Sequence, residues 1–192
     1  GYSGFYGAAV EGSGNIFVAG RERERFAVWK YNDSGALDTS FSPSDGDGID
    51  GVFILQTYSD GMAQGIGIDG NGKILVGGWA GDNGSGFWTM AFRLNADGSL
   101  DTTYGDGGAA VETRPSGSAF SQVAACRAGT DGSVVLAGYW SPAPYSTEMN
   151  PCIWRFTPEG NADPSFGTNG VAPLPGKQDL AAYAVTADGR SE

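Results

Sequence analysis

Three aspartates lie close together in the acidic segment 42–50, SPSDGDGID: Asp45, Asp47 and Asp50. Calcium binds carboxylate and carbonyl oxygens, and a glycine-rich loop lets several of them approach one ion without steric conflict. The spacing differs from that of an EF-hand loop, which also ends in a glutamate. The segment is therefore a candidate calcium site, with a solvated acidic turn as the alternative, and the sequence indicates no other cofactor.

The chain contains no histidine, which excludes several familiar kinds of catalytic site. Ser-His-Asp and Cys-His triads, histidine zinc ligands and histidine general bases all need that side chain. Two Gly-x-Gly-x-x-Gly matches, at 46–51 and 65–70, precede no plausible helix, so neither predicts a dinucleotide site. Paired carboxylates for glycoside cleavage stay open, because their separation in space cannot be read from the sequence. We expect a protein that is not an enzyme.

A second candidate binding surface consists of aromatic residues in or beside the segments between the expected second and third strands of each repeat. Aromatic rings can stack on sugars or anchor a protein partner, because they offer a large contact area at a small entropic cost. Rings that only pack onto the rim of the fold are the alternative. The candidates for contact with a glycan or a protein partner are Trp79, Trp88, Tyr139, Trp140 and Tyr145.

One basic and one acidic residue recur together, on either side of a turn. The pairs are Lys30 and Asp38, Arg93 and Asp101, and Arg155 and Asp163. One pair per repeat predicts a structural contact in which the cation holds the turn, and two unrelated solvent-facing charges are the alternative. A partly buried pair of this kind contributes about 1–3 kcal/mol through charge-assisted hydrogen bonds.

These residues are carried by an internal repeat. The segments GSGNIFVAG (12–20), GNGKILVGG (70–78) and TDGSVVLAG (130–138) align, and ADGR (187–190) begins a fourth copy. The aligned glycines are separated by 58, 60 and 57 residues, a period that suits a four-stranded propeller blade. We expect blade repeats at 1–59, 60–117 and 118–176, followed by the leading strand of an incomplete fourth repeat at 177–192.

Each repeat predicts four short antiparallel strands. A first strand leads through an Asp-Gly or Gly-x-Gly hairpin into a continuous apolar run, which is typical of a strand buried on both faces. An aromatic and β-branched third strand follows, then a turn and a weaker fourth strand. The aligned aromatics Trp29, Phe92 and Trp154 are expected in the core between blades. The sequence therefore predicts an all-β fold of β-propeller blades, with a β-sandwich or a parallel β-helix as alternatives.

Charge and cysteine content limit the partners. The formal net charge of −11 disfavours nucleic acid and anionic membrane surfaces, and no apolar run is long enough to cross a bilayer. Cys126 and Cys152 are too few for a disulfide scaffold, so buried thiols are expected, with a single disulfide as the alternative.

The turn after the third strand resembles a known family. The segments LDTSF (37–41) and LDTTY (100–104), together with DGNGKILVGG (69–78), are similar to the bacterial delta-sixty repeat. The sequence departs from the pattern of that family at two places, the longer segment 42–50 and Pro164 in ADPSF (162–166). Both departures concern the shape of a loop. The resemblance implies β-propeller repeats in large exported or surface proteins, and hence an extracellular or cell-surface structural or adhesive module.

The number of repeats leaves the ends of the array open. Closed propellers typically have four to eight blades, and three blades do not close a ring. Unpaired blade faces and strand edges bind other chains readily. The expected partners are therefore further blades of a longer chain or copies of this chain, with a carbohydrate ligand as the alternative.

Overall fold

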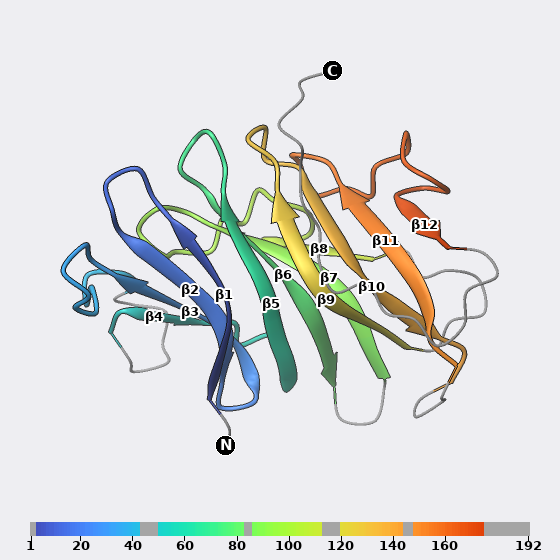
Figure 1. Ribbon diagram of the computed structural model, residues 1–192, viewed down its shortest axis with the longest axis horizontal. Coiled ribbons are helices and arrows are strands. Elements are labelled where there is room, and N and C mark those ends of the chain that lie inside the picture. The colour runs from blue at the N-terminus through green and yellow to red at the C-terminus, as the bar shows by residue number, and fades with distance from the viewer. Residues whose placement is uncertain (1–2, 43–49, 83–85, 113–119, 144–147, 175–192) are drawn as a thin grey trace.

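The computed structural model describes residues 3–42, 50–82, 86–112, 120–143 and 148–174 of the chain. These residues form twelve strands in three separate four-stranded sheets, which we call blades 1, 2 and 3 in chain order (Figure 1). Among them there is no helix that could span a membrane. Blade 1 contains β1 (Gly4–Val10), β2 (Ile16–Glu22), β3 (Arg25–Tyr31) and β4 (Val52–Ile54). Blade 2 contains β5 (Asp60–Ile68), β6 (Ile74–Asp82), β7 (Gly86–Leu94) and β8 (Ala109–Val111). Blade 3 contains β9 (Phe120–Ala128), β10 (Val134–Ser141), β11 (Asn150–Phe156) and β12 (Val171–Pro173).

Every blade is an antiparallel meander in which neighbouring strands follow the order of the chain. The fourth strand has three residues in each blade, which agrees with its weak sequence pattern. The first strands β1, β5 and β9 lie side by side across the three sheets (Figure 1). The predicted all-β fold of four-stranded propeller blades is confirmed for the described part of the chain, and the expected leading strand at 177–192 lies outside it.

A β-bulge recurs at the same place in each blade. The register between the first and second strands shifts after Phe5, Ala63 and Val123, which lie opposite Gly20, Gly78 and Gly138. A Cβ on any of these three glycines would overlap a carbonyl oxygen of the first strand. The glycine that ends each apolar run is therefore required by the close approach of two backbones.

Aromatic rings fill the core between blades 1 and 2. Phe92 of blade 2 lies with its ring centroid 5.4 Å from that of Phe26 and 5.6 Å from that of Phe53, both of blade 1. Two hydrophobic clusters, one on each face of blade 2, join it to its neighbours. This burial on both faces explains why β6 reads as a continuous apolar run instead of an alternating one.

Glycines let blade 3 approach blade 2 at the first and second strands. A Cβ on Gly65 would lie 2.7 Å from the Cβ of Cys126, and a Cβ on Gly77 would overlap Leu136. The three aligned aromatics are all buried, with exposed fractions of 8% for Trp29, 0% for Phe92 and 1% for Trp154. Phe92 and Trp154 lie in the cores between blades, as expected, whereas Trp29 packs in a cluster of blade 1 residues alone, so its expected place between two blades is wrong. Small residues on one blade and large residues on the next thus produce a tight interface.

Candidate functional site

The turn after the third strand is built around one aspartate in each blade. Oδ1 of Asp101 accepts hydrogen bonds from the backbone N–H of Thr103 at 3.2 Å and from its hydroxyl at 2.6 Å. Asp38 makes the same two bonds with Ser40, and Asp163 makes them with Ser165. The Asp-x-Ser/Thr pattern therefore forms a side-chain turn, which the intervening Pro164 does not disturb because that position donates nothing to the aspartate.

The second oxygen of each aspartate accepts a bond from the predicted cation. The Oδ2 of Asp38 lies 3.0 Å from Lys30 Nζ. The Oδ2 of Asp101 lies 2.9 Å from Arg93 Nε, and the Oδ2 of Asp163 lies 3.0 Å from Arg155 Nε. The structural pairing predicted from the repeat is thus confirmed at Lys30 and Asp38, Arg93 and Asp101, and Arg155 and Asp163.

These contacts keep the aspartates ionised. Burial opposes the charged form of Asp101, but hydrogen bonds from Thr103 and Lys73 outweigh burial and hold its pKa far below the ordinary value. Lys73 Nζ lies 2.9 Å from Asp101 Oδ2, a second cation that the spacing of the repeat did not indicate. Hydrogen bonds from Ser40 and Lys30 lower the pKa of Asp38, and those from Ser165 lower the pKa of Asp163.

The same turn also joins one blade to the next. The backbone N–H of Ser42 donates a 2.9 Å bond to the carbonyl of Asp97, and that of Gly105 donates a 2.8 Å bond to the carbonyl of Glu159. Ser42 and Gly105 are equivalent in the repeat, as are Asp97 and Glu159. We call this junction the interblade clasp. One part of the clasp is the Asp-x-Ser/Thr turn of one blade, at 38–42 or 101–105. The other part is the glycine turn that directly follows the third strand of the next blade, at 95–98 or 157–160.

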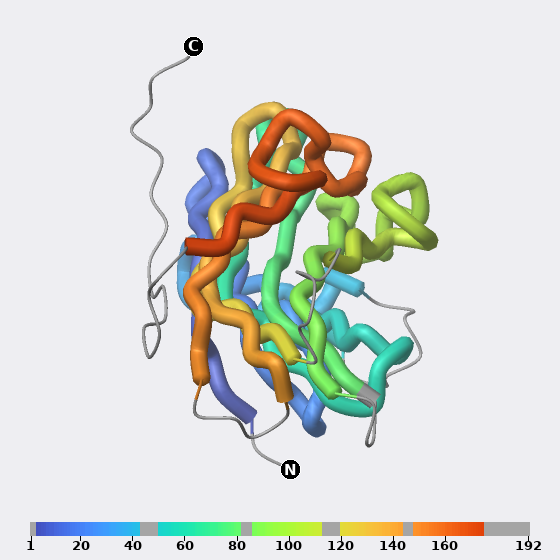
Figure 2. The backbone as a smooth tube through the Cα atoms, turned by 90° about the vertical axis from the view of Figure 1, so that its right-hand side faces the viewer, coloured from blue at the N-terminus to red at the C-terminus, as the bar shows by residue number. Residues whose placement is uncertain are grey.

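An aromatic ring and a glycine complete the clasp. Phe41 and Tyr104 occupy equivalent positions and have exposed fractions of 1% and 0%. The ring of Phe41 packs against Gly98 of blade 2, and that of Tyr104 packs against Gly160 of blade 3. Figure 2 shows the two turns of the second clasp at neighbouring positions, in yellow-green and orange-red. The recurring Phe or Tyr in LDTSF and LDTTY is a signal that could have indicated this contact.

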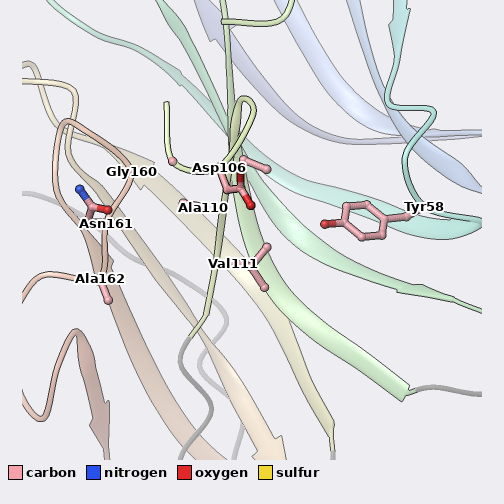
Figure 3. A pocket seen from close by; sticks show the side chains of 9 residues that line it. Tyr58, Asp106, Ala110, Val111, Gly160, Asn161 and Ala162 are labelled. Atoms are coloured by element: carbon pink, nitrogen blue, oxygen red, sulfur yellow. The ribbon is translucent and has the colours of Figure 1, made fainter. Parts of the chain in front are cut away.

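A shallow pocket of about 450 Å³ adjoins the clasp between blades 2 and 3. In Figure 3 Tyr58 lies on one side of it, and Gly160, Asn161 and Ala162 lie on the other. Asp106 is the single acid among the described residues that line it. The described residues that line this pocket therefore do not supply the two facing carboxylates that glycoside hydrolysis needs.

The predicted aromatic surface differs from what the sequence indicated. Trp79, Tyr139 and Trp140 belong to strands because β6 and β10 extend further than expected, and Trp88 lies near the start of β7. Tyr145 lies outside the described residues. Trp79 is 5% exposed and packs edge-on against Phe87 at 4.7 Å between centroids. Its placement in or beside a loop as a stacking surface is therefore wrong: an inward-facing strand position buries its ring.

Two of the other aromatic candidates, Trp88 and Trp140, also pack against the cores. Trp88 packs against the cluster between blades 1 and 2, with its ring 5.5 Å from that of Tyr58. Trp140 packs against the cluster between blades 2 and 3. Tyr139 lies on β10, with its hydroxyl bonded to Gln122 and its ring 6.3 Å from that of Phe120.

The candidate calcium site falls mainly on residues that the structure does not describe. Asp45 and Asp47 lie outside the described residues, and Asp50 is an exposed turn residue. Among the described residues no group of three or more acids or cysteines could hold a metal ion. Calcium binding by this segment stays a prediction.

Both cysteines are free thiols, on the non-adjacent strands β9 and β11. Cys152 has an exposed fraction of 0%. Cys126 keeps some exposed surface, but its sulfur lies in the interface with blade 2, against Gly77. Burial raises the pKa of each thiol to about 12.

Comparison with known proteins agrees with this geometry. A family described as a domain of unknown function (DUF5122) beta-propeller matches residues 12–41, 70–104 and 129–166, which together make up more than half of the chain. No curated protein matches the chain. The three matched segments each begin near the first hairpin of a blade and end in the Asp-x-Ser/Thr turn that follows its third strand. The chain therefore belongs to the DUF5122 β-propeller family.

Proposed function

We propose that this chain is a non-catalytic structural module that acts through protein–protein contacts, by stacking further blades onto the two ends of its array. The observation that supports the proposal most directly is the interblade clasp. It occurs twice with the same backbone hydrogen bond, once between blades 1 and 2 and once between blades 2 and 3. A contact that is repeated within the chain is suited to be repeated with further blades.

The outer face of blade 1 supports the same proposal. Its first strand presents Phe5 at 60% exposure and Val10 at 70% exposure. Val18 and Tyr31 are half-buried on this face, and the equivalent residues of blade 2 are fully buried against blade 1. A monomeric soluble protein rarely leaves such a contiguous apolar patch uncovered. We call Phe5, Val10, Val18, Trp29 and Tyr31 the open face of blade 1.

The proposal also includes the repeat family, the exported location and the absence of catalysis that the sequence led us to expect. Membership of the delta-sixty repeats and a place in an exported surface protein rest on the resemblance of the turn segments. Absence of catalysis is supported by the lack of histidine and by the single acid among the described residues of the pocket. Glycan binding is not favoured, because the ring of Trp79 is buried.

A tandem fusion of two copies of this chain tests the proposal. Joining the chains places the C-terminal end of one array next to the open face of another. We expect a melting temperature several degrees above that of the single chain, and weaker binding of an apolar fluorescent dye per chain, because apolar surface becomes buried. The control is a fusion of one chain to an unrelated soluble domain. Equal melting temperatures and equal dye binding for both fusions would contradict the proposal.

A further inference from the structure

We propose that the outer edge of blade 2 binds an extended peptide segment that carries a lysine or an arginine. The peptide adds a strand to β8, and its basic side chain enters the pocket beside that strand. This inference goes beyond the proposed function, because it concerns the side of the array and not the stacking of blades at its ends. Blade 2 lies between blades 1 and 3, so both neighbours of this surface are present in the structure.

The backbone groups of β8 alternate between two directions. Gly108 and Glu112 face β7: the carbonyl of Gly108 accepts a 3.2 Å bond from that strand, and the N–H of Glu112 donates a 3.0 Å bond to it. In an antiparallel ladder the residues between such bonded positions direct their N–H and C=O away from the partner strand. The outer edge of blade 2 is therefore formed by the N–H and C=O groups of Ala109 and Val111.

Val111 provides the unoccupied part of this edge. The backbone of Ala109 is already bonded on its outer side to the backbone of Asp106, at 2.8 and 3.3 Å. On the outer side of Val111 no backbone hydrogen bond joins it to any part of the chain that the structure describes, and the residue is 46% exposed. An extended peptide can pair with such an edge through two main-chain hydrogen bonds.

The edge of blade 2 differs from those of blades 1 and 3. The residue equivalent to Val111 is Ile54 in blade 1 and Pro173 in blade 3, because each pairs with the same position of the third strand. Ile54 is 2% exposed, so a peptide has no access to it. Pro173 has no N–H to donate. The strand-addition site is therefore specific to blade 2.

The pocket of about 450 Å³ lies around this edge. In Figure 3 Val111 lies between Tyr58 on one side and Asn161 of blade 3 on the other, and the hydroxyl of Tyr58 is directed toward β8. The volume is within the range of about 300–1,000 Å³ that is usual for ligand pockets. A side chain of a peptide that pairs with Val111 can therefore enter the pocket.

The chemistry of the pocket favours a cation. Its described lining residues include one acid, Asp106, and no lysine or arginine. The carboxylate of Asp106 is exposed and forms no ion pair or hydrogen bond with the described residues, unlike that of Asp101. Tyr58 and Asn161 place a phenol and an amide at the same pocket, and the oxygens of both groups accept hydrogen bonds from an ammonium or a guanidinium.

The charge of the whole chain favours the same occupant. The formal net charge of −11 attracts a basic segment and repels an acidic one, and such complementarity raises the rate and the specificity of association. An extended segment with a basic residue satisfies both the strand edge and the carboxylate. We identify the partner by these two properties.

A titration of the isotope-labelled whole chain with two capped heptapeptides, followed by nitrogen–proton correlation spectra, tests the inference. One peptide consists of threonine and valine with a central lysine, and the other has glutamine in place of the lysine. We expect the lysine peptide to shift the backbone amide resonance of Val111. It should bind about tenfold more tightly than the glutamine peptide, because only lysine pairs with a carboxylate.

Asp106→Asn tests the acidic part of the site. We expect it to raise the dissociation constant of the lysine peptide about tenfold and to leave that of the glutamine peptide nearly unchanged. The matched control is Asp33→Asn, which makes the same change of charge at an exposed turn position of blade 1. The control should change neither dissociation constant by more than about twofold.

Val111→Pro tests the strand edge. It removes the outward N–H, so we expect both peptides to bind about tenfold more weakly or worse. The fourth strand should tolerate this proline, because Pro173 follows Ala172 at the equivalent place in β12, as Val111 follows Ala110 in β8. Val111→Ala keeps the N–H and should change both dissociation constants by less than about threefold.

The outcomes decide the inference as follows. Binding that depends on the peptide lysine, on Asp106 and on the N–H of Val111 supports it. No binding at about 1 mM peptide, equal affinity for the two peptides, or an affinity that Asp106→Asn leaves unchanged would overturn it. If Val111→Pro does not fold, the peptide comparison and Asp106→Asn still decide.

Two further results separate this inference from its competitors. Glucose that shifts the Val111 resonance, while neither peptide does, would assign the pocket to a carbohydrate and overturn the peptide site. Failure of the peptide site leaves the proposed function intact, because the tandem fusion measures stacking at the ends of the array. Failure of the fusion likewise leaves the peptide site intact.

Discussion

Arg93 connects two blades with one side chain: its Nη1 lies 2.8 Å from the carbonyl oxygen of Pro158 in blade 3, while its Nε lies 2.9 Å from Oδ2 of Asp101 in blade 2. Its guanidinium also lies 4.8 Å from the ring centroid of Tyr104. The cation that stabilises the turn within a blade thus also holds the following blade. This double role links the stability of each repeat to the presence of its neighbour.

Replacing Arg93 should destabilise the fold more than replacing its equivalent at the open end. We expect Arg93→Ala to lower the free energy of unfolding by about 2 kcal/mol, because it removes two charge-assisted contacts of a mostly buried side chain. Arg155→Ala should cost less than about 1 kcal/mol, because that side chain is 41% exposed. Urea denaturation of both variants measures the difference, and equal losses would argue against the interblade role of Arg93.

Stability should fall in acid. Hydrogen bonds and cations lower the pKa values of Asp38, Asp101 and Asp163 in the folded state. A depressed pKa contributes stability above the unfolded value of about 3.9, and this contribution is lost as the pH falls through the folded value. The free energy of unfolding should therefore decrease between about pH 5 and pH 2, as measured by urea denaturation at several pH values.

The variant Asp101→Asn tests how much of the pH dependence of the free energy of unfolding comes from Asp101. We expect it to be less stable at pH 7 and to lose less stability on acidification, because its side chain does not titrate. Asp106→Asn, at an exposed position five residues after Asp101, is the comparison that should leave both quantities nearly unchanged. An unaltered pH profile in Asp101→Asn would show that this aspartate is not responsible.

The glycine opposite each bulge should not tolerate a side chain. A Cβ on Gly78 would overlap the carbonyl of Met62 and lie 2.6 Å from Cε1 of Phe26. We expect Gly78→Ala to cost about 1–3 kcal/mol through overpacking. Gly12→Ala, where a Cβ meets no atom within 4 Å, should change stability by less than about 0.5 kcal/mol. Thermal melting compares the two, and similar melting temperatures would contradict the close backbone approach.

The two thiols should react only when the fold opens. Burial raises the pKa values of Cys126 and Cys152 to about 12, so the reactive thiolate is scarce at pH 8. We expect a thiol reagent to modify both cysteines slowly in the native protein and rapidly in denaturant, followed by absorbance and mass. One rapidly modified cysteine in the native protein would show that its sulfur is accessible.

Some features followed from local chemistry alone. The repeat, the four strands of each blade and the pairing of Arg93 with Asp101 are all set by residues close together in the chain, so the sequence by itself determined them. Glycines with positive φ, Asx turns and continuous apolar runs constrain the backbone over a few residues and leave a readable pattern. The position of each blade's cation–aspartate pair was predictable for the same reason.

Only the tertiary structure decided how the blades join. The bond from Arg93 to Pro158 spans 65 residues, and the burial of Trp79 and Tyr104 depends on which faces meet. Spacing along the chain does not specify such contacts, because packing against a neighbouring sheet determines them. The same reason explains why the burial of Trp79 did not follow from its expected place in or beside the segment between two strands.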